Sequence, residues 1–174
     1  RIMVVDDVQM NLYLLEKAAC SCGEVIAHKN PLLALEECRT SAISHQAIDG
    51  TGWVRQPLDP APLNRRGQIF RMAMYHDNHP DHDYEMANLV EVFAPPHAIS
   101  WQPGMGPDDA NLELGGWIWR YDLRPVGDDQ TEVTLTYDWS AVRPELREHI
   151  EFPPFDRQHL DNSLKHLAEL ATAR

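Results

Sequence analysis

The chain has 174 residues, of which 43% are hydrophobic and 24% charged, a mixture typical of a globular domain with a substantial core. Its formal net charge of −12 argues against nucleic acid and anionic membrane surfaces as partners, because both are bound by clustered Lys and Arg. No apolar run approaches the ~18 residues that a membrane span needs.

Residues 1–43 predict a β-α-β-α order. The apolar run Ile2–Val5 indicates a short buried strand of the parallel type, and apolar residues recur at helical spacing over 10–19. A second strand candidate covers 24–27, and Asn30-Pro31 can cap and open a second helix. Because the chain begins without a methionine or a signal-peptide pattern, we expect it to be cut from a longer one.

All three cysteines, Cys20, Cys22 and Cys38, lie in this first part of the chain. An odd number confined to one segment does not form a disulfide framework, and Cys20-x-Cys22 alone is not a zinc spacing. We therefore expect reduced thiols in a cytoplasmic protein.

From His45 onward, the apolar residues alternate with period two, which is typical of antiparallel strands with one buried face. Five strands are predicted, over 68–76, 84–92, 97–101, 117–123 and 132–139. Pro, Gly and Asp clusters separate them, at 95–96, 103–104, 106–107 and 127–129. The segment 104–111 has the composition of a flexible loop.

The alternation assigns side chains to the buried face of each strand. That face holds Phe70, Met72 and Met74; Tyr84, Met86, Asn88, Val90 and Val92; Ile99 and Trp101; Trp117, Trp119, Tyr121 and Leu123; and Val133, Leu135, Tyr137 and Trp139. Such a face, rich in Trp, Tyr, Phe and Met, fits either a solid aromatic core or the wall of a cavity. On residue types alone, the solid core is favoured.

The chain closes with a predicted helix. Asp156 can cap it, and Leu160, Leu164, Leu167 and Ala171 recur at helical spacing. An antiparallel sheet followed by one amphipathic helix predicts an α+β fold.

Six segments, collinear over residues 45–173, resemble the SRPBCC or START-like superfamily, and are most similar to its bacterial polyketide cyclase/dehydrase-type members. They are Ile48-Asp-Gly-Thr-Gly-Trp, Phe70-Arg-Met-Ala-Met-Tyr, Tyr84-Glu-Met-Ala-Asn, Ile99-Ser-Trp, Trp117-Ile-Trp-Arg-Tyr-Asp-Leu-Arg-Pro-Val-Gly and Thr131-Glu-Val-Thr-Leu-Thr-Tyr-Asp-Trp-Ser. The resemblance implies a helix-grip fold, in which a curved antiparallel sheet wraps a long C-terminal helix around a deep apolar cavity. Members bind lipids, polyketides or other hydrophobic ligands, and a minority catalyse cyclisation or dehydration.

The front of the chain departs from this family, which normally starts with a strand and two short helices. Residues 1–43 resemble instead the first part of a response-regulator receiver domain, in which an acidic pair helps to bind Mg²⁺ beside a phosphorylatable aspartate. Asp6 and Asp7 match the acidic pair, and Asp49 lies near the expected acceptor position. This segment either replaces the missing strand and helices against the START-like sheet or is a spliced or truncated fragment that packs poorly. The predicted division is 1–43 and 45–174.

The densest group of potential metal ligands, His76, His79, His82 and nearby aspartates, surrounds Asn78 and Pro80. Those two residues predict a turn between strands, so we favour a solvated hairpin tip and expect no metal and no cofactor.

Asn88 is the polar exception on the buried face. Two interpretations stay open, a ligand-binding amide and a core amide that is bonded to the backbone. For acid–base catalysis the best-phased residues are Tyr84, Tyr121 and Tyr137, whereas Arg71, Arg120 and Asp138 are out of phase and should face solvent. The sequence contains no recognisable catalytic constellation.

The leading hypothesis is a domain that binds a hydrophobic small molecule between the sheet and the C-terminal helix. The predicted ligand-binding residues are Phe70, Met72, Met74, Tyr84, Met86, Asn88, Trp101, Trp117, Trp119, Tyr137, Leu160 and Leu164. The alternatives are a polyketide cyclase or dehydratase on the same scaffold, and a phosphorelay receiver module.

Overall fold

A computed structural model describes residues 2–6, 49–59, 61–125 and 130–172. The strands are β1 (Ile2–Asp6), β2 (Val54–Pro57), β3 (Ile69–Tyr75), β4 (Asp83–Ala94), β5 (Ala98–Met105), β6 (Glu113–Leu114), β7 (Ile118–Pro125) and β8 (Gln130–Asp138). The helices are the 3₁₀ helix η3 (Asp109–Asn111), α3 (Pro144–Arg147) and α4 (Gln158–Thr172).

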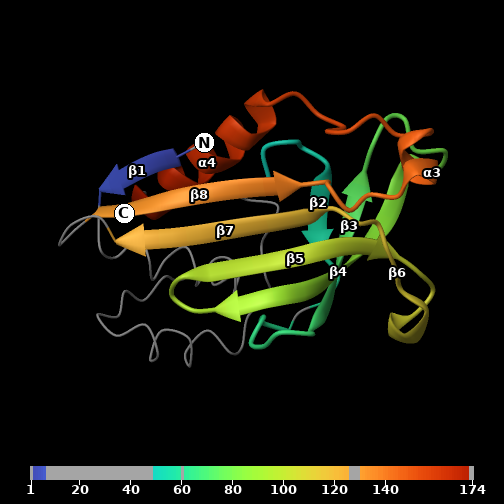
Figure 1. Cartoon of the computed structure of the whole chain (residues 1–174), viewed down its shortest axis with the longest axis horizontal. Coiled ribbons are helices and arrows are strands. Elements are labelled where there is room, and N and C mark those ends of the chain that lie inside the picture. The colour runs from blue at the N-terminus through green and yellow to red at the C-terminus, as the bar shows by residue number, and fades with distance from the viewer. Residues whose placement is uncertain (1, 7–48, 60, 126–129, 173–174) are drawn as a thin grey trace.

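The strands form one sheet in the order β1-β8-β7-β5-β4-β3-β2, with β6 added to β5 (Figure 1). Every pairing is antiparallel. Helix α4 packs on one face, where its Leu164 and Leu167 join a buried cluster with strand residues such as Val90 and Val133. We call this the inner face. The predicted α+β helix-grip arrangement is thus confirmed.

All five strands predicted from the period-two pattern are present, as β3, β4, β5, β7 and β8. The assignment of faces holds in β7 and β8, where Trp119, Tyr121 and Leu123 pair with Tyr137, Leu135 and Val133. The sequence did not predict β2 and β6, which have only four and two residues, too few for a periodic signal.

One assignment, that of Val92 to the inner face, was wrong. Between Val90 and Val92 the β4–β5 register shifts, so that Val90 pairs with Trp101 and Val92 with Ser100. Glu91 is the extra residue of this β-bulge, and beyond it Phe93 takes the inward position and packs against the core. A bulge reverses the alternation of faces, and nothing in the local residue pattern marks it.

Strand β5 extends past its predicted end and includes Pro103 and Gly104, which had been assigned to the intervening loop. Pro103 is tolerated because β7 pairs with β5 only over Ala98–Trp101, and β6 pairs with it only from Gly104. Pro103 therefore lies opposite Asn88 of β4 on one edge of β5, and on the other edge between the stretches that pair with β7 and β6, where no N–H is needed for the ladder.

Strand β1 corrects the expectation of a parallel strand. It lies at one end of the described sheet and pairs antiparallel with β8, from Ile2 opposite Thr134 to Asp6 opposite Gln130. The outer edge of β8 offers unpaired N–H and C=O groups, which this pairing satisfies. The remainder of the predicted β-α-β-α segment, residues 7–43, lies outside the described residues, as do the three cysteines and Asp7.

Candidate functional site

Seven of the twelve residues predicted to bind a ligand belong to the core cluster or pack against it: Phe70, Met72, Met74, Trp101, Trp119, Leu160 and Leu164. The binding role of all twelve stays a prediction. Cross-strand pairing places Met74 opposite Tyr84, Met72 opposite Met86 and Phe70 opposite Asn88. Six of the twelve are buried: Phe70, Met72, Asn88, Trp101, Tyr137 and Leu164. The other six are only half-buried: Met74, Tyr84, Met86, Trp117, Trp119 and Leu160.

The half-buried members gather at one end of the sheet. Trp117 and Trp119 lie where β7 begins, and Met74 and Tyr84 lie beside the turn that joins β3 to β4. Towards the other end of β7 and β8, Leu123 and Val133 are 5% and 0% exposed. The packing against α4 therefore loosens towards the end at which β7 starts.

Helix α4 shows the same gradient. Leu160, in its first turn, is half-buried, whereas Leu164 and Leu167 are 3% and 2% exposed. The beginning of α4 thus covers the sheet less completely than its middle. Large apolar side chains that keep accessible surface on a covered face are the ones available to a ligand.

Phe155, just before α4, is the centre of an aromatic cluster at this end. Its ring lies 4.9 Å from that of Tyr137, 5.5 Å from Trp119, 5.9 Å from His159 and 6.1 Å from Trp53, between ring centroids. Phe155 was not among the residues predicted from the sequence, because it falls outside any periodic segment. A usable signal was present, since an apolar residue before the cap and another at the fourth helical position form a hydrophobic staple.

The predicted cap at Asp156 is confirmed. Asp156 Oδ1 accepts a hydrogen bond from Gln158 N at 2.8 Å, which satisfies one of the free amides at the start of α4. The cap fixes the point at which α4 begins and therefore the positions of Phe155 and Leu160 on either side of it.

A polar stripe on α4, formed by His159, Ser163 and His166, binds the backbone of Asp49 and Gly50. Ser163 Oγ accepts from Gly50 N at 2.8 Å, and the Nδ1 atoms of His159 and His166 lie 2.8 and 3.2 Å from the carbonyl oxygens of Gly50 and Asp49. The three side chains are four and three residues apart, which places them on one face of a helix. This contact was not predicted from the sequence, because it joins parts of the chain more than 100 residues apart.

The carboxylate of Asp49 is engaged within its own loop. Oδ1 accepts from the backbone N and the hydroxyl of Thr51 at 2.9 and 2.6 Å, and Oδ2 accepts from Val54 N at 3.0 Å. These bonds form an Asx-type turn that leads the chain into β2. The bonds give Asp49 a structural role, whereas the receiver resemblance had implied a phosphate acceptor.

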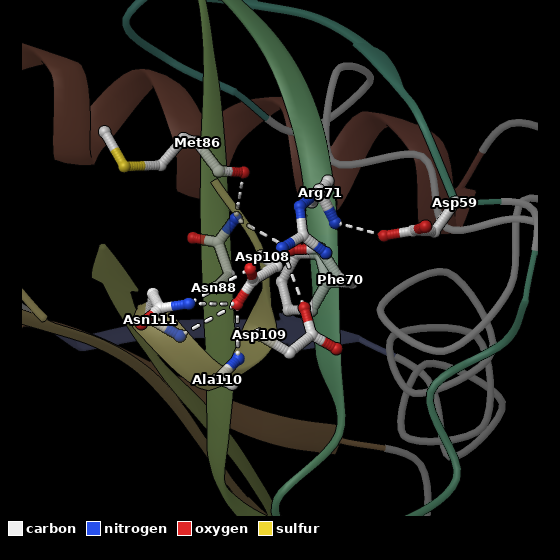
Figure 2. A network of polar contacts seen from close by, with 9 residues as sticks. All are labelled: Asp59, Phe70, Arg71, Met86, Asn88, Asp108, Asp109, Ala110 and Asn111. Carbon is white, nitrogen blue, oxygen red and sulfur yellow. Dashed lines mark hydrogen bonds and ion pairs between the residues drawn. The ribbon is translucent and has the colours of Figure 1, made fainter. Parts of the chain in front are cut away.

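Asn88 is 1% exposed, and its amide donates to the backbone. Figure 2 shows its Nδ2 between the carbonyl oxygens of Met86 and Phe70, at 3.2 and 3.5 Å. This geometry matches the second of the two interpretations, a core amide bonded to the backbone, for the Nδ2 end of the side chain.

The three candidate tyrosines differ in access. Tyr121 is buried and stacked on Trp101, Tyr137 is buried against Phe155, and Tyr84 alone is half-buried. Burial raises the pKa of all three phenols, and the charge of Asp49 contributes a smaller increase for Tyr84 and Tyr121. Each therefore stays protonated at neutral pH, a state that suits a hydrogen-bond donor and not a base.

The residues predicted to be out of phase do face away from the core. Arg71 forms an ion pair with Asp109 of η3 at 2.7 Å, as Figure 2 shows, and Arg120 pairs with Asp122 on its own strand at 2.6 Å. Asp138 is exposed, and a hydrogen bond from Ser140 N lowers the pKa of its carboxyl.

The His-rich segment forms the predicted hairpin tip between β3 and β4. His76 N donates to His82 O at 2.9 Å, and the ring of His79 stacks on Tyr84 with centroids 4.4 Å apart. Among the described residues, no group of three or more His, Cys, Asp and Glu side chains could hold a metal ion. Within the same part of the chain, no helix is long and apolar enough to cross a membrane.

Comparison with solved structures places the chain among helix-grip proteins. It is similar to the KanY protein, with a TM-score of 0.53 and 11% identity over 98% of this chain and 94% of that one. It is also similar to norcoclaurine synthase from Thalictrum flavum, with a TM-score of 0.51 and 14% identity over 100% and 92%. A protein from Rhodobacter sphaeroides matches with a TM-score of 0.50 and 13% identity over 99% and 91%.

At these identities the similarity shows the fold alone, a helix grip of the Bet v1-like type. No protein-family model and no curated protein sequence matches the chain.

Proposed function

We propose that the protein binds a hydrophobic small molecule, such as a lipid or a polyketide, between the inner face and the first turns of α4. The observation that carries this proposal is the set of half-buried Trp, Met and Tyr side chains on a face that α4 covers. In a solid core such residues are expected to be fully buried, as Leu123 and Val133 are at the opposite end.

The chemistry of the face defines the class of ligand. None of the twelve predicted residues carries a charge at neutral pH, and Asn88 directs its amide donor to the backbone. Methionines such as Met74 and Met86 adapt to irregular shapes, and Trp119 offers a wide apolar surface. A flat, uncharged ligand with a large apolar area fits these groups best.

The finer assignment, to polyketide cyclase/dehydrase-type proteins, rests on the sequence segments that resemble that group. The similarity to norcoclaurine synthase supports it only at the level of the scaffold, since one helix-grip fold carries both binding proteins and enzymes.

Titration with the neutral dye N-phenyl-1-naphthylamine tests the binding proposal. We expect dye fluorescence to rise on binding and the Trp119→Leu protein to bind about five- to tenfold more weakly, because part of the aromatic wall is lost. The matched control is Ile118→Ala, on the opposite face of β7, which should leave the affinity unchanged.

The proposal fails if the wild-type protein neither changes the fluorescence of the dye nor gains thermal stability in its presence. Equal weakening by Trp119→Leu and Ile118→Ala would place the dye elsewhere on the protein.

The second candidate is an enzyme of the cyclase or dehydratase type on the same scaffold, and Tyr84 favours it. Tyr84 is half-buried beside the stacked ring of His79, and its raised pKa keeps the phenol protonated as a donor to a substrate carbonyl. If this protein turns over a polyketide-type substrate, Tyr84→Phe should reduce kcat at least 100-fold while dye affinity changes less than twofold. Substrate depletion followed by mass spectrometry measures the rate, and an unchanged kcat would remove Tyr84 from the reaction.

A further inference from the structure

A single hydrogen bond to the backbone of Gly50 fixes both the position of the His159 ring and the ring nitrogen that carries the proton. Its Nδ1 lies 2.8 Å from the carbonyl oxygen of Gly50, which can only accept a hydrogen bond. Nδ1 must therefore carry the proton and donate. In the neutral ring, Nε2 is then an acceptor with its lone pair in the ring plane.

The surroundings of His159 make this acceptor unusual. Its ring is half-buried at the loosely packed end of the grip, with Phe155 at 5.9 Å and Trp53 at 6.3 Å between centroids. Among the described residues, none donates a hydrogen bond to Nε2. An acceptor on a half-buried ring that borders an aromatic cluster favours a partner that brings its own donor.

We propose that His159 Nε2 accepts a hydrogen bond from a hydroxyl group of the bound molecule, so that the ligand class is an aromatic or polycyclic compound with a phenol or alcohol. This inference rests on the proposed binding function and deepens it. The rings of Trp119 and Phe155 contact the apolar part of the ligand, and His159 selects its polar end.

His166 provides a matched comparison on the same helix. Its Nδ1 also lies within hydrogen-bonding distance of a backbone carbonyl, that of Asp49 at 3.2 Å. Unlike His159, it makes no ring contact within the described part of the chain, and it lies two turns farther along α4, beside the tightly packed region. A change at His166 therefore perturbs the stripe without altering the aromatic cluster.

Two ligands with the same rings separate the contribution of the hydroxyl donor to the affinity from that of the apolar rings. Calorimetric titration with 2-naphthol and with 2-methoxynaphthalene compares an O–H donor with an ether that lacks one. We expect the wild-type protein to bind 2-naphthol about tenfold more tightly, the size of one hydrogen bond in an apolar setting.

Three variants then test whether Nε2 of His159 is the atom that accepts the hydrogen bond. His159→Asn keeps a donor where Nδ1 was and removes Nε2, so it should bind the two ligands equally. His159→Gln places an amide oxygen near the position of Nε2 and should retain part of the preference, while His166→Asn should retain all of it. Thermal unfolding of each variant confirms that it is folded. If His159→Asn does not fold, the reduced preference expected of His159→Gln, compared with the full preference of His166→Asn, is the test.

The outcomes are distinct. Equal affinity of the wild-type protein for both ligands, or loss of the preference in His166→Asn as well as His159→Asn, overturns the role of His159 and leaves the binding proposal standing. If neither naphthalene derivative nor the neutral dye binds the wild-type protein, the proposed function itself fails, and this inference fails with it.

Discussion

Replacing Gly50 with alanine is expected to lower the free energy of unfolding by about 3 kcal/mol, because overpacking and lost hydrogen bonds act together. A Cβ atom at Gly50 would overlap the carbonyl oxygen of His159 and lie 2.6 Å from both the N and the Oγ of Ser163. Two of these atoms belong to the backbone of α4 and cannot rotate away. Either the loop or the helix must shift, and the bonds from Gly50 to His159 and Ser163 are then weakened. Urea denaturation, followed by tryptophan fluorescence, measures the change.

Gly52 supplies the control within the same loop. It has a φ of +74°, and a Cβ there meets no atom within 4 Å, so Gly52→Ala carries only the cost of a left-handed backbone, about 1–2 kcal/mol. Gly50→Ala should therefore be the more destabilising of the two. If the two variants are equally stable, the close approach of Gly50 to α4 does not contribute to folding.

Truncating Phe155 to alanine should cost about 3–5 kcal/mol, as expected for a buried aromatic ring whose neighbours cannot fill the space. Phe155 is 9% exposed and lies between α4 and the sheet, in ring contact with Trp53, Trp119, Tyr137 and His159. Its removal also frees surface on Trp119 and Tyr137, so dye affinity should change along with stability. The free energy of unfolding and the dye titration are measured on the same protein.

Phe152, three residues earlier, is the matched control. It is half-buried, and its only ring contact in the described part of the chain is with Trp117 at 5.7 Å. Phe152→Ala should cost about 1–2 kcal/mol, in proportion to the smaller buried area. A loss for Phe155→Ala no larger than that for Phe152→Ala would contradict the central position of Phe155 in the cluster.

Gly50 and Phe155 both help to hold α4 against the candidate binding face. Gly50 allows the 49–54 loop to approach the polar stripe of α4, and Phe155 fills the space between the start of α4 and the sheet. Together they hold the end of the helix at which the inner face remains partly accessible. The candidate site is thus built by segments that flank α4 as much as by the strands beneath it.

Local residue patterns were sufficient to predict the strands and the helix whose apolar residues recur regularly. Alternation of apolar side chains predicted β3, β4, β5, β7 and β8 with most of their inward faces, and helical spacing with the Asp156 cap predicted α4. These elements are predictable because burial of one side of a strand or helix requires apolar residues at a regular spacing along the sequence.

The tertiary structure alone decided the features that depend on distant contacts. The bulge at Glu91 places Val92 on the outer face, and β1 pairs antiparallel with the edge of β8. Gly50 donates a hydrogen bond to Ser163, which is 113 residues away in the sequence. Phe155 became the centre of a cluster only because the strands and α4 converge around it. A residue pattern records which faces are buried, but it does not record how tightly they are covered. For this reason the loosely packed end of the inner face, on which the proposed function rests, became visible only in the folded chain.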